Sequence, residues 1–275
     1  MVNTRNICAL ISLLLSMHRM QLVQCLDQSR IVANGNILHW PALVLQRILS
    51  AIPSSQAFCP RNFLFSWNDD GRLPALQAYD DLSIADNILR QVPFSSSNIP
   101  VFTKFLLRYT CPGCGTSAEK ETWREKSFTV VPMLPLPADR RQVSLEECMT
   151  TFLNTPENTR CTVCGTNVAG QLVPRRGKYT VVQMKRYENY HSILRNKLDH
   201  NGTMDILADI VSIVARRGGL RAGHFVSYHC VSDQWYCNDD QRMMTRINYN
   251  PLRNPASFGA LHHSETADLI CFKNT

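Results

Sequence analysis

The sequence predicts an α+β fold, in which a helical N-terminal part precedes a part made mainly of β-strands. Three observations support this class: an apolar run near the N-terminus has helical spacing, residues near the C-terminus alternate as in strands, and two Cys-x-x-Cys pairs lie between them. The chain has 275 residues, of which 44% are hydrophobic. It can therefore bury a substantial core, as one large domain or two small ones.

The first expected element is a helix that starts close to Cys8. Asn6 can cap it, and its apolar positions recur at helical spacing: Ile7, Leu10, Ile11, Leu14 and Leu15. A Cys at a helix N-terminus beside an imidazolium ionises readily, so Cys8 is a candidate nucleophile. Asn3 would lie just outside the helix, where its side-chain amide could donate to a developing oxyanion.

A signal peptide is the competing interpretation of this N-terminus. Arg5 and the apolar residues 7–17 imitate its charged and apolar regions. Asn201 would then begin a glycosylation acceptor, and Cys8 would be removed. We favour the folded helix because no small-x-small cleavage pattern follows. No other apolar run approaches membrane-spanning length, so no membrane partner is expected.

The two Cys-x-x-Cys pairs, each followed by Gly, predict a zinc ribbon that binds one structural Zn²⁺. Each pair would form a tight knuckle, and the two knuckles complete a tetrahedral site with no open position. Redox-active or merely buried pairs are the less favoured alternative. The four expected ligands are Cys111, Cys114, Cys161 and Cys164.

The segment between the two pairs must fold outward and return. It begins with a strand-like run at 128–131. A capping box from Ser144 to Glu147 then opens a helix that continues through about Leu153. The pairs are therefore expected at the tips of neighbouring strands.

The region around His224 predicts a β-hairpin. Alternating residues continue from His224 to Cys230, Asp233 marks a turn, and a second strand covers 234–237. This hairpin would return the corner at 238–240 to His224, where an acid could orient the imidazole. In chain order, Cys8 and this region then supply the nucleophile, base and acid of a thiol protease.

Taken together, these features resemble the catalytic domain of the ubiquitin-specific proteases, which are papain-like deubiquitinases. The resemblance covers nearly the whole chain in the right order. It rests on the Cys box at 3–14, the His box with Trp235 and Asp239-Asp240, the paired cysteines, Met184-Lys185-Arg186-Tyr187 and a closing strand at 267–272.

The resemblance implies a papain-like cysteine protease fold in a single domain, 1–275. It assigns a helical thumb to 1–98, zinc-ribbon fingers to 99–180 and a mixed β palm with the His box to 181–275. It implies Cys8 as nucleophile, His224 as general base, Asp239 as the orienting acid and Asn3 as oxyanion donor. Asn238 is the alternative acid.

The chain also departs from the family pattern. Arg5, Ile7 and Ala9 replace the Gly, Thr and Tyr of the Cys box, and the leading Gly-Leu is absent, so the start is interpreted as truncated. The acidic segment that receives the basic tail of ubiquitin in the family is reduced here to Asp81, with Ile84 at the Glu position. Loss of that carboxylate favours altered substrate recognition.

The expected activity is cysteine-type hydrolysis of the isopeptide bond after the C-terminal Gly-Gly of ubiquitin or a ubiquitin-like modifier, such as a SUMO-like protein. A weak or inactive ubiquitin-binding relative is the alternative. A zinc-dependent nucleic-acid-binding module is the lesser one, suggested by the net charge of +7 and pI near 8.9. Nucleic acid is not the expected partner, because no aromatic residues interleave the basic clusters. Eleven cysteines, an odd count, fit a reducing compartment, either cytoplasm or nucleus.

Overall fold

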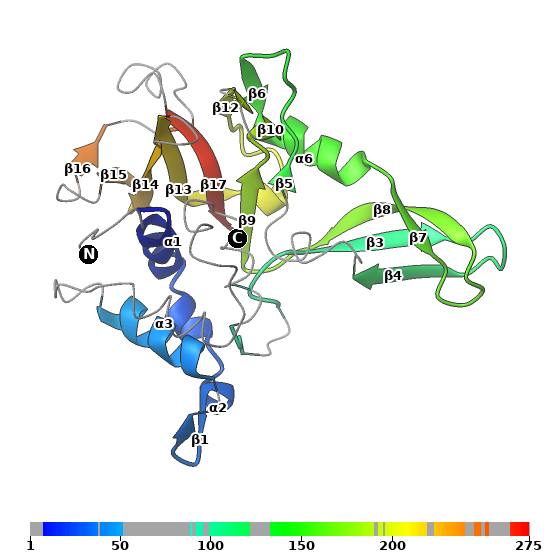
Figure 1. Cartoon of the computed structure of the whole chain (residues 1–275), viewed down its shortest axis with the longest axis horizontal. Coiled ribbons are helices and arrows are strands. Elements are labelled where there is room, and N and C mark those ends of the chain that lie inside the picture. The colour runs from blue at the N-terminus through cyan, green and yellow to red at the C-terminus, as the bar shows by residue number, and fades with distance from the viewer. Residues whose placement is uncertain are drawn as a thin grey trace.

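A seven-stranded sheet forms the centre of the computed structural model, with the order β16-β15-β14-β13-β17-β9-β5 (Figure 1). Its strands are β5 (Met133–Leu134), β9 (Tyr179–Met184), β13 (Asp209–Gly218), β14 (Gly223–Val231), β15 (Gln234–Asn238), β16 (Thr245–Ile247) and β17 (Glu265–Lys273). All neighbours are antiparallel except β5 and β9. The structure describes residues 8–37, 39–51, 89, 92–95, 99–121, 133–189, 192–194, 196–218, 223–239, 245–248, 251–252 and 265–274.

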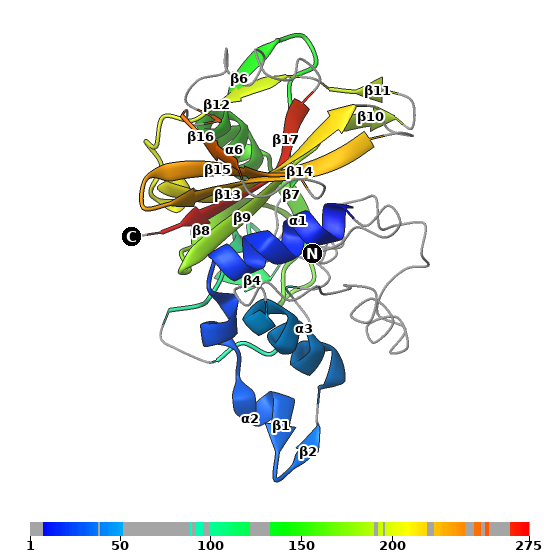
Figure 2. The same ribbon diagram turned by 90° about the vertical axis from the view of Figure 1, so that its left-hand side faces the viewer.

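Helix α1 (Cys8–Arg19) packs on one face of this sheet against β13 and β14. Figure 2 shows α1 between the sheet and α3 (Trp40–Ala51). Nine of the twelve α1 residues are buried, so the helix is enclosed on nearly all sides rather than on the single core face that the spacing predicts. Between the two helices lie η1 (Leu22–Cys25), α2 (Gln28–Ile31), β1 (Val32–Ala33) and β2 (Asn36–Ile37).

The opposite face of the sheet is covered by α6 (Leu145–Asn154). The predicted helix is confirmed, and Ser144 caps it by accepting the N–H of Glu146 at 3.1 Å. Glu147, the expected partner in the capping box, instead pairs with Arg140. Smaller elements surround this side: β6 (Gln142–Ser144), β10 (Tyr187–Asn189), β11 (Ser192–Ile193), β12 (Lys197–Asp199) and η4 (Asp205–Leu207).

A separate four-stranded sheet, with the order β4-β3-β8-β7, extends away from the central sheet (Figure 1). Its strands are β3 (Lys104–Thr110), β4 (Ser117–Glu121), β7 (Glu157–Arg160) and β8 (Asn167–Arg175). At its base, Asn274 donates hydrogen bonds to Thr103, Gly177 and Thr180 in the buried interior. A Cβ on Gly177 would lie 2.2 Å from the backbone carbonyl carbon of Phe102, so only glycine fits this junction.

The hairpin predicted around His224 is confirmed by β14 and β15. Ser232 and Asp233 form its turn with positive φ angles of 47° and 61°, which match the twist of the flanking strands. The strand expected at 128–131 lies outside the described residues. In the described part of the chain, no helix is both long and apolar enough to cross a bilayer.

A chain of buried polar groups joins α1 to the sheet. The Ser16 and Ser212 hydroxyl oxygens are 2.7 Å apart, and Ser212 Oγ is 3.0 Å from His229 Nδ1. The other His229 nitrogen lies 3.0 Å from Ser227 Oγ. Burial, assisted by the charges of Arg19 and His18, lowers the pKa of His229 to about 3, so the imidazole is neutral in the folded protein.

We expect acid to destabilise the wild-type chain more steeply than His229→Gln. Because the folded pKa of His229 is about 3 against an ordinary 6.5, only the unfolded chain gains this proton as the pH falls from 6.5 toward 3. The extra loss of unfolding free energy should approach about 1.4 kcal/mol per pH unit. Urea unfolding at about pH 7.5, 6.5 and 5.5 measures it. Equal pH dependence in both proteins would contradict a buried neutral His229.

Candidate active site and metal centre

Cys8 is the first residue of α1 and is only 5% exposed. Its Sγ accepts a hydrogen bond from the backbone N–H of Phe225 at 3.4 Å. Phe225 follows His224 in β14, so the packing of α1 brings the thiol beside the first residues of this strand.

His224 and Asp239 form the second part of the site. Nε2 of His224 lies 2.8 Å from Asp239 Oδ1, and both side chains are partly exposed. Asp239 directly follows β15, and the β14–β15 register pairs Ser227 with Asn238. Burial opposes ionisation of Asp239, but hydrogen bonds from His224 and Arg217 outweigh it and lower the pKa of this carboxyl.

Arg217 is a neighbour of this pair that the sequence did not indicate. Its Nη1 lies 3.0 Å from Asp239 Oδ2, and its Nη2 lies 2.6 Å from Glu265 Oε1. Arg216 and Arg217 both lie near the end of β13, where Arg216 is buried beside Asp268. The signal that could have found these roles is strand alternation, which directs the two side chains to opposite faces of the sheet.

Several expected site residues lie outside the described part of the chain. Asn3, the expected oxyanion donor, and Asn6, the expected helix cap, are among them. Asp240 and the acidic segment at 80–84 are also outside it. Of the two alternative acids, the structure brings Asp239 into contact with His224, whereas Asn238 is the last residue of β15.

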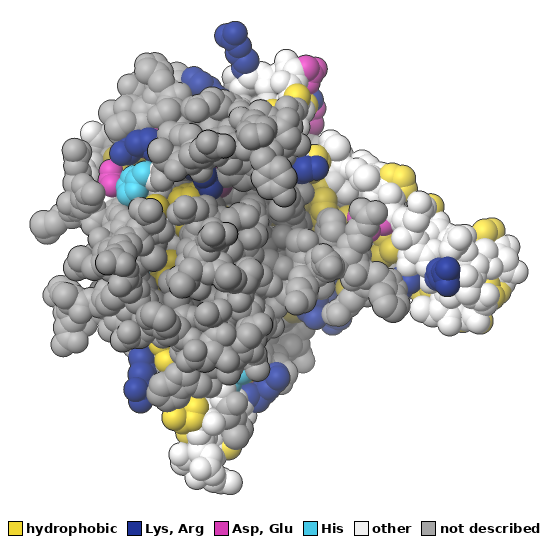
Figure 3. All heavy atoms as spheres, in the orientation of Figure 1, with side chains coloured by type: hydrophobic (Ala, Val, Ile, Leu, Met, Phe, Trp, Pro, Cys, Tyr) yellow, Lys and Arg dark blue, Asp and Glu magenta, His cyan; other side chains and the backbone are white. Residues whose placement is uncertain are grey.

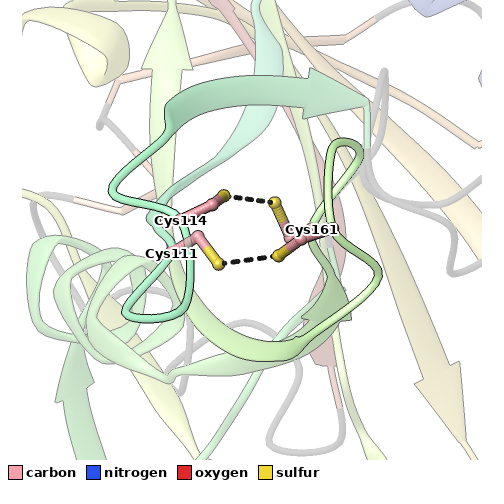
Figure 4. Close-up of side chains that lie close together, drawn as sticks. Cys111, Cys114 and Cys161 are labelled. Carbon is pink, nitrogen blue, oxygen red and sulfur yellow. Dashed lines mark hydrogen bonds between the residues drawn. The ribbon is translucent and has the colours of Figure 1, made fainter.

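The sulfur atoms of the four paired cysteines all lie within 4.8 Å of one another. The Sγ atoms of Cys111 and Cys164 are 3.5 Å apart, and those of Cys114 and Cys161 are 3.7 Å apart. Figure 4 shows Cys111 and Cys114 on one side of this cluster, facing Cys161 on the other. A tetrahedral zinc ion with Zn–S bonds of about 2.3 Å would separate its sulfurs by about 3.8 Å. The donor set and its spacing therefore fit a structural zinc ion.

The two cysteine pairs sit on matching turns at the end of the four-stranded sheet. In the first, the N–H of Cys111 donates to the Thr116 carbonyl, and Gly115 adopts a φ of 71°. In the second, the N–H of Cys161 donates to the Thr166 carbonyl, and Gly165 adopts a φ of 73°. Glycine carries these left-handed conformations without the strain of a Cβ.

The ionisation of these thiols also suits a cation. Hydrogen bonds from the Thr166 hydroxyl and backbone N–H lower the pKa of Cys164 to about 6. Burial, with the neighbouring Cys164 sulfur, raises the pKa of Cys111 to about 11. The two pKa values diverge because adjacent sulfurs repel one another when both are negatively charged. A divalent cation would remove this repulsion and let all four cysteines bind as thiolates.

A polar cavity of about 920 Å³ lies at the end of β13 and β14 that is opposite to His224. Its lining includes Asp209, Cys230, Asp233, Arg246 and Lys273. Neither Cys8, His224 nor Asp239 is among its lining residues, so this cavity is separate from the candidate active site.

The described residues form a mixed α/β fold with a four-cysteine cluster compatible with a zinc ribbon. Two of the solved structures that overlap the full chain are DUB modules bound to ubiquitin or its aldehyde. One is the SAGA Ubp8/Sgf11/Sus1/Sgf73 DUB module bound to ubiquitin aldehyde, which matches with a TM-score of 0.61 and 17% identity over 69% of that chain. The other is the SAGA DUB module bound to monoubiquitin, which matches with a TM-score of 0.58 and 16% identity over 68% of that chain. Both cover 100% of this chain.

One curated protein gives a sequence match. It is the probable ubiquitin carboxyl-terminal hydrolase 8 of Schizosaccharomyces pombe, 22% identical over 156 residues. The match covers 51% of this chain and 34% of that protein, so the chain spans about a third of its relative's length. No protein-family model matches the chain. The chain is thus a diverged domain that resembles the ubiquitin-specific proteases.

We expect the purified chain to contain about one zinc ion, and the ion to be lost when Cys111 and Cys161 are both replaced by Ser, because each knuckle then loses a thiolate. Metal analysis of dialysed protein measures this. Cys230→Ser with Cys237→Ser is the matched control, because both thiols lie outside the cluster. A folded wild-type chain without metal would contradict the zinc centre.

Proposed function

We propose that the chain is a thiol hydrolase that cleaves the isopeptide bond after the C-terminal Gly-Gly of ubiquitin or a ubiquitin-like modifier. The observation that carries the proposal is that the Cys8 thiol contacts the N–H of Phe225, while the adjacent His224 contacts Asp239. The likeness of the fold to a DUB module bound to ubiquitin aldehyde supports this choice of substrate.

In the proposed reaction, the Cys8 thiolate attacks the carbonyl carbon of the modifier's last glycine. His224 holds the thiol proton and delivers it to the leaving lysine amine as the C–N bond breaks. Nε2 of His224 is hydrogen-bonded to the Asp239 carboxylate, which leaves Nδ1 of the same ring for this proton transfer. Water then attacks the thioester, releasing the modifier carboxylate and restoring the thiol. Asp239 keeps the ring oriented and stabilises the imidazolium.

Asn3 is proposed to donate to the oxyanion that forms during attack. The four-cysteine centre would have only a structural role, because four protein ligands leave no position for substrate or water. Its proposed contribution is to hold two knuckles together at the end of β3 and β7. We propose the same division of the chain as before: thumb at 1–98, fingers at 99–180 and palm at 181–275. We also propose a location in the cytoplasm or nucleus, because eleven cysteines, an odd count, fit a reducing compartment.

A modifier-binding protein without turnover is the second candidate. The burial of Cys8, at 5% exposed, favours it, because an attacking thiol must be reached by the substrate carbonyl. Retention of a thiol, an imidazole and a carboxylate favours the enzyme. A nucleic-acid-binding module is less favoured. On the face drawn in Figure 3, the described Lys and Arg side chains are scattered rather than gathered into a stripe.

Covalent capture tests the proposed nucleophile. We expect the chain to form a mass adduct with a ubiquitin- or SUMO-derived electrophilic tail probe, and Cys8→Ala to form none. Intact mass spectrometry measures the adduct, and the probe that reacts identifies the modifier. Cys25→Ala is the control, since Cys25 is likewise outside any disulfide and is more exposed than Cys8. Binding of a modifier by folded wild type without any adduct would support the non-catalytic candidate.

The two alternative acids can be separated by substitution. Asp239→Ala should lower kcat/KM by about 10²-fold or more, because the imidazole loses both its orientation and its counter-charge. Asn238→Ala should change kcat/KM by less than about threefold. Steady-state hydrolysis of a fluorogenic modifier conjugate measures both. The reverse order would assign the role to Asn238.

A further inference from the structure

A connected set of side chains continues from His224 through Asp239 to residues that the proposed reaction does not use. The two oxygens of Asp239 are divided, with Oδ1 at 2.8 Å from His224 and Oδ2 at 3.0 Å from Arg217. Arg217 Nε donates to Glu265 Oε1 at 2.8 Å, and the Tyr228 hydroxyl donates to Glu265 Oε2 at 2.6 Å. This set begins at the imidazole and ends inside the protein.

Strand register determines this arrangement. Arg217 in β13 pairs with His224 in β14 on one side and with Glu265 in β17 on the other. Tyr228 lies four positions after His224 and therefore on the same face of β14. The side chain of Glu265 is only 2% exposed, so its charge is poorly screened by solvent.

The charges of this set alternate in sign from Asp239 through Arg217 to Glu265. Arg217 by itself would oppose a proton on His224 and would neutralise Asp239. Glu265 balances Arg217, which leaves the negative charge of Asp239 available to the imidazolium. Burial opposes the charge of Arg217, but hydrogen bonds and charge from Glu265 and Asp239 outweigh it and raise its pKa.

The described titratable groups that surround His224 come from five elements. They are Cys8 of α1, Arg217 of β13, Tyr228 of β14, Cys237 of β15 with the adjoining Asp239, and Glu265 of β17. Burial raises the pKa of Cys237 to about 11, so that thiol stays neutral. The charged group that contacts Asp239 from the side away from His224 is thus Arg217, and Glu265 pairs with Arg217 in turn.

We propose that Arg217 and Glu265 act as a pair of positioning residues for Asp239. Arg217 holds the carboxylate with one oxygen directed at His224, and Glu265 cancels the charge of Arg217 so that Asp239 stabilises the imidazolium. This inference rests on the proposed roles of His224 and Asp239, and it adds two residues that would govern the basicity and orientation of the imidazole.

The titration of His224 tests the pair without requiring activity. NMR of histidine-labelled protein, with His224→Gln to assign the resonance, gives the imidazole pKa in each variant. Glu265→Gln should lower this pKa by about half a unit or more, and Arg217→Gln should raise it by a similar amount. The double variant should return close to wild type. Shifts of both single variants in one direction, or no shift, would overturn the proposal.

Arg217→Lys separates charge from geometry. Lysine keeps the positive charge but cannot bridge two carboxylates with a planar fork. The imidazole pKa should stay near wild type, while kcat should fall about tenfold or more because Asp239 is less well held. If Glu265→Gln fails to fold, by circular dichroism, the comparison of Arg217→Gln with Arg217→Lys still decides the result. Equal pKa shifts in these two variants would rule out the charge-balancing role.

An exposed pair supplies the matched control. Arg108 and Glu119 pair at 2.5 Å on the four-stranded sheet, and Arg108→Gln or Glu119→Gln should leave the His224 pKa unchanged. In the active enzyme, the alkaline limb of the kcat/KM profile should move with the NMR pKa. If no modifier probe reacts with wild type, the proposed function fails, whereas the NMR titration still decides whether Arg217 and Glu265 act on His224.

Discussion

The candidate site depends on the pairing of β13 with both of its neighbours. This strand places Arg217 opposite His224 on one side and opposite Glu265 on the other. A slip of one residue along β13 would turn Arg217 to the other face of the sheet and bring Arg216 into its place. Because apolar residues of β13 enter cores on both faces, such a slip would also expose much of the interior.

Helix α1 adds the thiol to this frame from the beginning of the chain. It is enclosed between the sheet and α3, and the Ser16–Ser212 contact holds it to β13 in a largely apolar interface. These polar groups are satisfied by one another, which is the condition for burying them at little cost. The position of Cys8 against Phe225 is thus a result of packing over the whole length of α1.

Two buried arginines share one buried carboxylate behind the site. Arg186 lies 3.7 Å and Arg216 3.3 Å from oxygens of Asp268. Arg186 also donates to the carbonyls of Ala267, Leu194 and Asn196, which gives the Lys-Arg-Tyr segment a structural role. Arg216 lies 4.4 Å from the centroid of the Phe225 ring. This cation–π contact joins the buried charge to the residue whose N–H faces Cys8.

The sequence by itself determined those elements that depend only on residues close together in the chain. The β14–β15 hairpin, the helix after Ser144 and the two glycine-containing cysteine turns follow from alternation, capping and left-handed glycine. Tertiary structure decided which pieces meet. The pairing of Arg217 with Glu265 could not be found from sequence, because β17 follows β15 and β16 in the chain yet lies beside β13 in the sheet. Their partnership arises from strand order, a long-range choice set by burial of both sheet faces.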